Sequence, residues 1–387
     1  MSDVEFGLNL ESGEEFINNV YSYVITDLRN NSIISELPFT GVTYEKNLSK
    51  SGTADLTLII NDETIKLNPN AFTFPGRVGV YIYRNDQVMW GGIIFKRQYD
   101  SSNRSLRVTA KSFEEYFYHI IQRKNINVTN TEQLTIARRI VTENNAHKDT
   151  LITVDNDTTT GVLRERNMYS YEFKTVGEEL ERLSSLLNGF DWNVEVLADP
   201  VSKALTRNLS FYYPTKGKSQ TNTDLLFEFP GAIREFTLSD DAENGANILY
   251  GIGAGEGDEQ LSYSKTDTSQ VTTSKYPRLE STVSYKSVSE ASTLKSHVES
   301  DLKTMLTPVT VIEVTLRGDG EGEHEVGTYD VGDWARFRIE DPFLTEPIDQ
   351  FHRITGFKVS VEDSSGLETV TLVLGDDDAN LADDSEV

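Results

Sequence analysis

Two stretches of sequence that resemble each other decide the fold. They read GIIFKRQYDSSNRSLRVTA at residues 92–110 and GFKVSVEDSSGLETVTLVL at residues 356–374. In each, two apolar runs flank a polar segment rich in Asp and Ser, residues that favour turns because their side chains bond their own backbone. Apolar residues alternate strictly with polar ones in the second stretch, as in a half-buried antiparallel hairpin. We therefore expect a hairpin at each place, the first with arms at 93–99 and 106–110.

The similarity extends beyond the hairpins and predicts an internal duplication. Residues 78–83, expected to form a strand that turns at Asn85-Asp86, correspond to residues 334–339. Further upstream, residues 41–45 and 54–58 correspond to residues 231–235 and 246–250. The second copy carries the longer insertion. The pattern predicts two similar antiparallel β-barrel domains in one chain.

Four helices are expected between the strands. Three begin with a capping-box pattern, in which a Ser or Thr is followed three residues later by Glu. These patterns start at Ser112, Thr175 and Ser287, and the third helix is expected to end before Pro308. The second is expected to end at Gly189, since glycine commonly follows a helix. The fourth helix is expected over residues 131–145, and the apolar stripes of all four indicate core packing.

The resulting fold class is α+β, mainly β, with five parts. They are a first β-barrel domain at 1–112, an inserted α/β domain at 113–224, a second β-barrel domain at 225–255 and 308–375, an inserted loop and helix at 256–307, and an acidic tail at 376–387. Residues 253–274 are rich in Gly, Ser, Thr and charge, which predicts a long loop. The tail has six acidic residues and no basic one, so we expect it to be solvated.

Composition excludes several classes of function. The 387 residues contain no cysteine, so neither disulfides nor thiolate metal sites are possible. The formal net charge is −26, and such an acidic surface repels nucleic-acid phosphate and anionic lipid. The N-terminal residues have neither the basic nor the apolar region of a secretory signal, and no apolar run is long enough to span a membrane.

Motifs for catalysis, cofactors or metals are not found, and we predict no catalytic, cofactor-binding or metal-binding residue. None of the five histidines forms an HExxH motif, and there is neither a Gly-x-Ser-x-Gly elbow nor a P-loop. Residues 318–323 alternate Gly with acids but lack the spacing of a calcium loop. The adjacent acids Asp240-Asp241 and 376–378 show no carboxylate pair held across a cleft. Gly251-x-Gly253-x-Gly255 precedes a Ser/Thr-rich segment where a dinucleotide site needs a helix.

Several blocks of the sequence carry a resemblance to a known family. They are residues 44–56, 90–94, 106–118, 186–192, 251–255, 329–334 and 353–357. In order and spacing, they are similar to the tail-hub or baseplate-hub proteins of long-tailed phages, the Gp37-like minor tail proteins of siphophages. The resemblance covers residues from about 40 to 375.

The resemblance implies a non-enzymatic structural protein of the virion, located at the tail tip and assembled in the host cytoplasm. It implies a homotrimer in which two barrel domains per chain form a ring, with the α/β domain inserted between them. The partners implied are the distal tail protein or tail tube, a central tail fibre and the tape measure protein. DNA would pass through the lumen without stable binding, and no cofactor or membrane is involved. An acidic lumen would favour passage, because a basic wall binds phosphate.

The alternative is a carbohydrate-binding module or glycoside hydrolase of a phage adhesion device. The chain has 17 Tyr and three Trp (Trp90, Trp192 and Trp334), whose rings can stack on sugars. Aromatic side chains serve core and interface packing more often, so the structural role is preferred.

Overall fold

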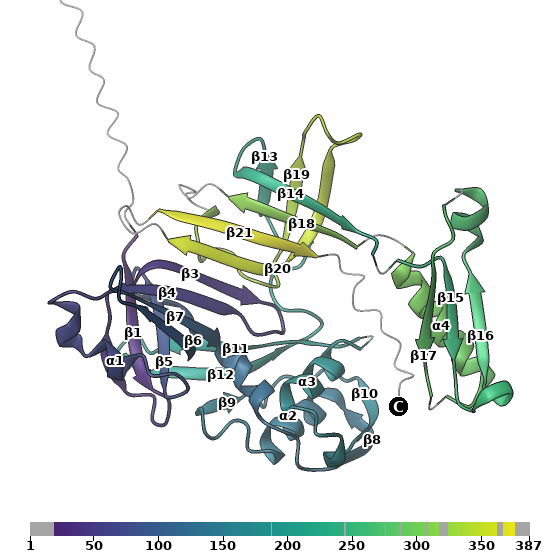
Figure 1. Cartoon of the computed structure of the whole chain (residues 1–387), viewed down its shortest axis with the longest axis horizontal. Helices are drawn as coiled ribbons and strands as arrows, with labels where there is room; N and C mark the ends of the chain where they lie inside the picture. The colour runs from purple at the N-terminus through teal and green to yellow at the C-terminus, as the bar shows by residue number, and fades with distance from the viewer. Residues whose placement is uncertain are drawn as a thin grey trace, which may run out of the picture.

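The computed structural model describes residues 19–186, 188–243, 245–274, 276–286, 288–306, 309–316, 324–361 and 367–375. This part of the chain is mainly β, as expected. Thirteen of its strands belong to a single, largely antiparallel sheet, and three smaller sheets accompany it. Figure 1 shows the large sheet across the upper left, helices beneath it, and a smaller unit standing apart at the right.

The first set of strands in the large sheet is purple and blue in Figure 1. Its members are β3 (Thr40–Asn47), β4 (Thr53–Ile59), β5 (Val78–Arg84), β6 (Gln87–Asp100) and β7 (Ser105–Ser112). They lie side by side in the order β3-β4-β7-β6-β5, and β1 (Tyr21–Asp27) and β2 (Ile33–Glu36) continue the sheet beyond β5. Both predicted hairpins of this region are confirmed. Asn85 and Asp86 have φ of 48° and 65°, the left-handed conformation that a two-residue hairpin turn requires.

The second set, yellow and green, repeats this order. Its members are β14 (Ile233–Asp241), β18 (Val309–Leu316), β19 (Trp334–Ile339), β20 (Ile348–Val361) and β21 (Glu368–Gly375). They lie in the order β14-β18-β21-β20-β19, and β13 (Leu226–Phe229) pairs with β19 in parallel. We call the two sets the first repeat and the second repeat. They join where β20 pairs with β3.

The duplication is therefore visible in the order of the strands, with two corrections. First, the bulges at Phe95 and Thr355 and the ladders of β3 and β14 shift the expected matches of Gly92 with Gly356 and of residues 41–45 with 231–235 by four residues. Second, the expected match of residues 246–250 with 54–58 is wrong, because residues 248–252 pair in a different sheet. The position of β4 beside β7 is taken in the second repeat by β18 beside β21. The sequence match was uninformative here, because short apolar strands that follow a turn have similar sequences whether or not they occupy equivalent positions.

The described strands of the large sheet form an open path and not a closed barrel. Its ends are β2 and β14, and no other described strand pairs with their outer sides. The two β-barrel domains expected from the sequence thus have no closed counterpart in the described pairing.

The segment between the repeats mixes helices with two small sheets. Its elements are η2 (Phe113–His119), β8 (Ile126–Glu132), α2 (Gln133–Glu143), β9 (Ile152–Val154), β10 (Leu163–Met168), η3 (Ser170–Glu172), α3 (Val176–Ser184), β11 (Asp191–Ala198) and β12 (Leu205–Tyr212). β8 pairs with β10, and β12 lies between β11 and β9. Figure 1 places this segment beneath the first repeat.

The predicted helices of this segment are present with local differences. Thr175 and Glu178 form the predicted capping box of α3. The helix expected after Ser112 is a 3₁₀ helix, and the Ser112 side chain makes no capping bond. Helix α3 ends at Ser184, before Gly189, where a Cβ would lie 1.8 Å from the carbonyl oxygen of Ser184.

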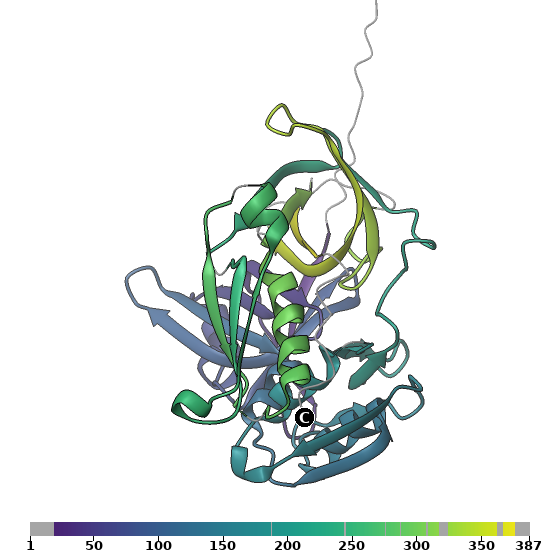
Figure 2. The ribbon, with the colours of Figure 1, turned by 90° about the vertical axis from the view of Figure 1, so that its right-hand side faces the viewer.

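The unit at the right of Figure 1 is inserted between β14 and β18. It contains β15 (Ile248–Ile252), η4 (Gly257–Glu259), β16 (Ser262–Thr266), a π-turn η5 (Ser269–Thr273), β17 (Glu280–Ser284) and α4 (Ala291–Met305). The prediction of a long loop at 253–274 is wrong, because β16 lies within these residues and pairs with β15. Figure 2 shows α4 lying along this small sheet.

Three clusters of buried apolar side chains hold these parts together. The largest contains side chains of both repeats, including Tyr44 and Leu56 of the first and Phe357 and Leu372 of the second. The second lies on the opposite face of β5 and β6, where Tyr81 and Ile93 pack against η2, α2, α3, β11 and β12. The third is small and lies between α4 and its sheet. The large sheet and the segment beneath it therefore share packed cores, whereas the insertion has its own.

Near the N-terminus, a 3₁₀ turn η1 (Thr64–Leu67) and a short helix α1 (Pro69–Phe72) connect β4 to β5. Some predicted features lie outside the described residues: the acidic tail at 376–387, the segments 318–323 and 362–366, Ser287 and Pro308. Helix α4 begins at Ala291, with Glu290 at its N-cap.

Candidate functional site

A polar face covers the outer side of eight neighbouring strands, β14-β18-β21-β20-β3-β4-β7-β6. Along each strand, buried apolar residues alternate with polar ones, so the polar side chains project from the side opposite the core. We call this surface the hydroxyl face. Its polar members include Thr43, Glu45, Asp55, Thr57, Lys96, Arg107, Thr109, Thr237, Glu313, Thr315, Lys358, Ser360, Thr369 and Thr371.

Short hydrogen-bonding side chains connect neighbouring strands across this face. Thr109 Oγ1 donates to Asp55 Oδ1 at 2.7 Å. The hydroxyls of Thr43 and Ser360 lie 3.4 Å apart across the junction of the two repeats. Lys358 lies opposite Glu45 in the same ladder, a pair of opposite charges. The face is thus rich in hydroxyl groups, with acidic and basic side chains interspersed, and offers a low-relief polar wall.

A buried ion pair ties the two repeats together from within the core. Arg84 of β5 binds Glu368 of β21 through two contacts, Nε to Oε1 at 2.5 Å and Nη2 to Oε2 at 3.2 Å. Tyr21 Oη donates to the same carboxylate at 2.6 Å. Arg84 also reaches Glu325 at 3.1 Å and the carbonyl of Val326 at 3.2 Å. Arg84 and Glu368 are 7% and 4% exposed, so each is the main partner of the other's buried charged group.

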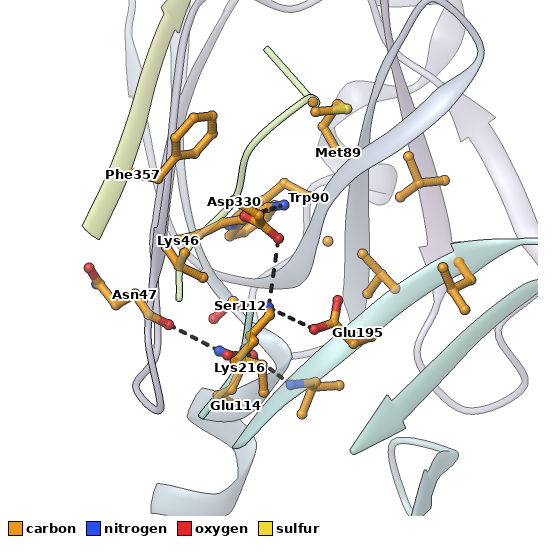
Figure 3. A pocket seen from close by; sticks show the side chains of 18 of the residues that line it. Lys46, Asn47, Met89, Trp90, Ser112, Glu114, Glu195, Lys216, Asp330 and Phe357 are labelled. Atoms are coloured by element: carbon orange, nitrogen blue, oxygen red, sulfur yellow. Dashed lines mark hydrogen bonds and ion pairs between the residues drawn. The ribbon is translucent and has the colours of Figure 1, made fainter. Parts of the chain in front are cut away.

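A second charged cluster lies where both repeats meet β11. Lys216 Nζ contacts Glu195 Oε1 at 2.8 Å and Asp330 Oδ2 at 3.6 Å, and Lys46 Nζ contacts Asp330 Oδ1 at 3.2 Å. These groups border a pocket of about 210 Å³ that is also lined by Trp90 and Phe357. Figure 3 shows the lysines and carboxylates converging on it. The network joins three parts of the chain.

The charges of this network determine its titration. Burial alone would raise the pKa of Glu195, but the charge and hydrogen bond of Lys216 lower it below its usual value. Burial likewise opposes the shift at Asp330, where Lys46 and Lys216 lower the carboxyl pKa. Burial would lower the pKa of Lys216, but Asp330 and Glu195 raise it. Glu195, Asp330 and Lys216 therefore remain ionised around neutral pH.

Glu114 of η2 lines the same pocket, but unlike Glu195 and Asp330 it has no basic side chain beside it among the described residues. Its Oε1 accepts from the backbone N–H of Val194 at 2.8 Å, whereas Oε2 has no hydrogen-bond partner in the described structure. Burial raises the pKa of the Glu114 carboxyl, since its side chain lacks a basic partner to offset the loss of water. The Oδ1 atom of Asn193 nearby is also unsatisfied.

The turn before β19 forms the neighbouring part of this junction. Arg353 pairs with Asp191 and donates to the carbonyls of Gly332 and Lys216, each at 3.1 Å. Gly332 has φ of +97° and its Cα approaches Lys216 so closely that a Cβ would lie 2.8 Å from the Lys216 carbonyl oxygen. Residues 329–334, one of the blocks noted in the sequence, are thus a structural joint.

Residues singled out in the sequence do not assemble into a chemical site. The three Trp side chains are buried, and Trp90 Nε1 donates to the carbonyl of Glu45 at 2.9 Å. His119 stacks on Phe95 at 5.0 Å, and His352 is buried against Phe337. In the glycine motif, a Cβ on Gly251 would lie 2.1 Å from Val298 of α4, so close packing explains this glycine.

The described residues contain no group of three or more His, Cys, Asp or Glu side chains placed to hold a metal ion. Within the same ranges, no helix has the length and apolarity needed to cross a membrane. Sequence reasoning missed Arg84, Glu368, Lys216 and Arg353. Arg84, Arg353 and Glu368 give only the signal of a charge within a strand, which does not identify the partner, and Lys216 lies in the loop after β12.

Comparisons with known proteins identify the family of the chain and proteins of similar fold. The sequence matches the family model described as Siphovirus ReqiPepy6 Gp37-like protein over residues 32–376. No curated protein sequence matches the chain.

Among solved structures, the chain is similar to the tail protein from Neisseria meningitidis MC58, with a TM-score of 0.59 and 13% identity over 92% of this chain and 97% of that one. It is equally similar to the 43 kDa tail protein of prophage MuSo2 from Shewanella oneidensis, with a TM-score of 0.59 and 13% identity over 93% and 99%. A chain of the Francisella PdpA-VgrG complex matches with a TM-score of 0.53 and 10% identity over 92% of this chain and 58% of that one. At such identities the likeness is one of fold.

Proposed function

The chain belongs to the Siphovirus ReqiPepy6 Gp37-like family, and on this premise we propose that it is the hub protein of a phage tail tip. It is a structural protein of the tail or baseplate, like its structural neighbours. In the proposal, three copies form a ring that joins the tail tube or distal tail protein to the central fibre. The ring gives a channel for the tape measure protein and then DNA.

The repeat of the strand order β3-β4-β7-β6-β5 as β14-β18-β21-β20-β19 is the observation that carries this proposal. A chain with two similar units presents six units when three copies assemble. Closed rings are the ordinary outcome of repeated head-to-tail interfaces. Such a ring has near-sixfold symmetry on one face, which suits a sixfold tube, and threefold symmetry elsewhere, which suits a central fibre.

The hydroxyl face is the proposed channel wall. It spans both repeats without interruption through the β20–β3 pairing. Hydroxyl groups and interspersed charges of both signs provide no continuous basic track, so phosphate gains little by counterion release. The net charge of −26 further disfavours adhesion of DNA to the ring as a whole.

In the proposed arrangement, each repeat is one barrel-like, ring-forming domain and the segment at 113–224 is a domain inserted between them. β15, which was expected in the second barrel domain, pairs with β16 and β17 and therefore belongs to the insertion between β14 and β18. These two additions lie outside the channel wall and are available to neighbouring tail proteins. The acidic tail at 376–387 follows the second repeat.

We propose no catalytic role for the chain. The carbohydrate-binding or glycoside hydrolase alternative relied on accessible rings of Tyr and Trp. All three Trp side chains are buried, and the exposed Tyr99, Tyr171 and Tyr276 lie on β6, on η3 and after η5. A charged pocket of about 210 Å³ that is braced by its own ion pairs fits a joint between domains.

The test is the mass and shape of the purified chain, by light scattering and electron microscopy at rising concentration. We expect a threefold mass and a ring with a central hole, with the hydroxyl face toward the hole. A single-copy mass at every concentration would contradict a self-assembling ring. A ring whose hole is lined by mainly Lys and Arg side chains would contradict the proposed channel.

A further inference from the structure

The second half of β6 and the outer side of β14 are among the strand edges of the large sheet that have no partner strand in the described residues. On one side of β6, pairing with β5 stops at Ile93, and the Ile94 carbonyl then accepts from the N–H of Gly76 at 2.7 Å. Beyond this point, residues 95–100 pair only with β7 on the other side. β14 likewise pairs with β18 on one side only. Unpaired strand edges are templates for pairing with another strand.

Because the two repeats share one strand order, each unpaired edge has an equivalent edge in the other repeat. A bulge interrupts the β6–β7 ladder at Phe95, and another interrupts the β20–β21 ladder at Thr355. Aligning the two bulges superposes the second half of β6 on the second half of β20. The ladders β3–β4 and β14–β18 similarly align Tyr44 with Leu238. The free edge of β6 is therefore equivalent to the edge of β20 that binds β3, and the free edge of β14 is equivalent to the edge of β3 that binds β20.

The register of the β20–β3 pairing can then be transferred. Within the chain, Gly356 lies opposite Asn47, Phe357 opposite Lys46, Lys358 opposite Glu45 and Val359 opposite Tyr44. The equivalent residues of the free edges are Lys96 opposite Asp241, Arg97 opposite Asp240, Gln98 opposite Ser239 and Tyr99 opposite Leu238. The bond from the N–H of Leu48 to the Thr355 carbonyl, at 3.0 Å, becomes one from Ala242 to Phe95.

The transferred register follows from backbone pairing alone, and it is also complementary in charge. Lys96 of the β6 edge faces Asp241 of the β14 edge. Arg97, whose Nη1 also donates to the Asn70 carbonyl at 2.6 Å, faces Asp240. Lys96 and Asp241 are exposed, and both lie on the hydroxyl-face side. Tyr99, 54% exposed, faces the partly buried Leu238. Opposite charges directly across an antiparallel ladder are stabilising.

We propose that β6 of one copy pairs antiparallel with β14 of a second copy, with Lys96 opposite Asp241 and Arg97 opposite Asp240. The proposal rests on the ring proposed above and specifies its subunit interface. β6 and β14 belong to different repeats of one chain (Figure 1), so the contact is head-to-tail and repeats around a ring. The hydroxyl face then continues from each copy to the next.

The decisive experiment uses the absence of cysteine from the chain. Gln98→Cys and Ser239→Cys place one thiol on each edge, at directly opposite positions of the proposed register. Mixing the two single variants under mild oxidation is expected to give a covalent dimer, and the double variant to give covalent trimers. Each single variant alone is the matched control and is expected to give no covalent product.

A charge exchange provides the second measurement. Lys96→Asp and Asp241→Lys each put like charges opposite one another, and we expect each to raise the concentration needed for half-assembly by about tenfold or more. The double exchange is expected to restore assembly to within about threefold, since it recreates an opposite pair. Both residues are exposed, so unchanged thermal unfolding of the single copies confirms that the fold is intact.

The outcomes separate the interface from the function. Rings that form while the cysteine pair gives no cross-link, or while the exchanged charges have no effect, would overturn the β6–β14 pairing and leave the hub role standing. Cross-links with rescue by the double exchange would support the pairing. Failure to form any oligomer, with no cross-link at high concentration, would overturn both proposals.

Discussion

A buried ion pair between Arg84 and Glu368 connects the two repeats. Replacing Glu368 should therefore lower the stability of the fold. The Glu368 carboxylate holds Arg84 through two contacts and accepts from Tyr21. Glu368→Gln leaves the Arg84 charge buried without its main partner, and breaking a buried pair in this way costs about 3–5 kcal/mol. We expect a loss of that size in the free energy of unfolding, measured by urea denaturation at pH 7.

The control for this change is Glu228→Gln, which breaks a pair of Glu228 and Arg338 at 3.3 Å in which both side chains are about half exposed. Exposed pairs contribute about 0–1 kcal/mol, so its effect should be small. Equal losses in the two variants would show that Arg84 is not dependent on Glu368.

Glu114 leads to a pH-dependent prediction. Burial raises the pKa of this carboxyl in the folded chain. The folded state therefore favours the protonated form, and its stability falls as pH rises through the folded pKa. Glu114→Gln retains an acceptor for the Val194 N–H and adds a donor near the unsatisfied Asn193 Oδ1. We expect the variant to be more stable than the parent at pH 7–8, and the difference to shrink below pH 4.

The comparison requires thermal unfolding of both proteins across this pH range. A difference that stays constant with pH would mean that the charge of Glu114 is not its cause. The Lys216 network provides the opposite sign, because its carboxyl pKa values are lowered. Its contribution is present above the unfolded carboxyl pKa and is lost in acid.

At the scale of elements, the sequence was informative wherever local chemistry determined the structure. Strict alternation predicted the hairpin of β20 and β21, and Thr175 with Glu178 predicted the start of α3. The two arms expected at 87–90 and 93–99 form the single strand β6. Pairing between distant strands was not predictable in the same way. β15 resembles β4 in sequence, but it pairs with β16 and β17, while β18 takes the equivalent place. The choice depends on contacts across the whole insertion, which no short pattern records.

Gly251 tests how the insertion is packed. A Cβ at this position would lie 2.1 Å from Cγ2 of Val298, a fully buried residue of α4. Gly251→Ala must push α4 away from its sheet, and overpacking of this kind costs about 1–3 kcal/mol. We expect faster amide hydrogen exchange in α4 and β15, with β20 and β21 unchanged, because the insertion has a separate core.

Val298→Ala in the same chain makes room for the new methyl group. The double variant should therefore recover part of the protection of α4 amides that Gly251→Ala removes. Loss of protection in β20 and β21 as well would show that the insertion and the large sheet unfold together, contrary to their separate cores.

At the scale of the molecule, the sequence revealed the duplication but not the surface that the duplication builds. The hydroxyl face exists only because β20 pairs with β3, which places Lys358 opposite Glu45 across more than 300 residues of chain. Arg84 and Glu368, 284 residues apart, were equally hidden. Such pairings are set by the arrangement of complete repeats, so they follow from the structure and not from residue patterns.

The proposed channel predicts where added positive charge should interfere with DNA. Thr43→Lys, Thr315→Lys and Thr369→Lys together place three cations per copy on the hydroxyl face, at positions where no basic residue lies directly opposite. A ring would concentrate these charges around one hole. Each phosphate neutralised steepens the slope of log affinity against log salt by about 0.9. We expect DNA binding with a slope several units steeper than that of the parent, and slower DNA ejection from virions that carry the variant.

The matched control adds three lysines at exposed strand positions of the inserted segment, by Asn127→Lys, Thr129→Lys and Thr206→Lys. Both triple variants have the same net charge, so a difference between them reports position alone. If the face lines the channel, only the first variant retards DNA, because its cations surround the path while those of the control point elsewhere. Equal DNA binding and equal ejection rates in the two variants would show that the hydroxyl face is not the surface that DNA passes.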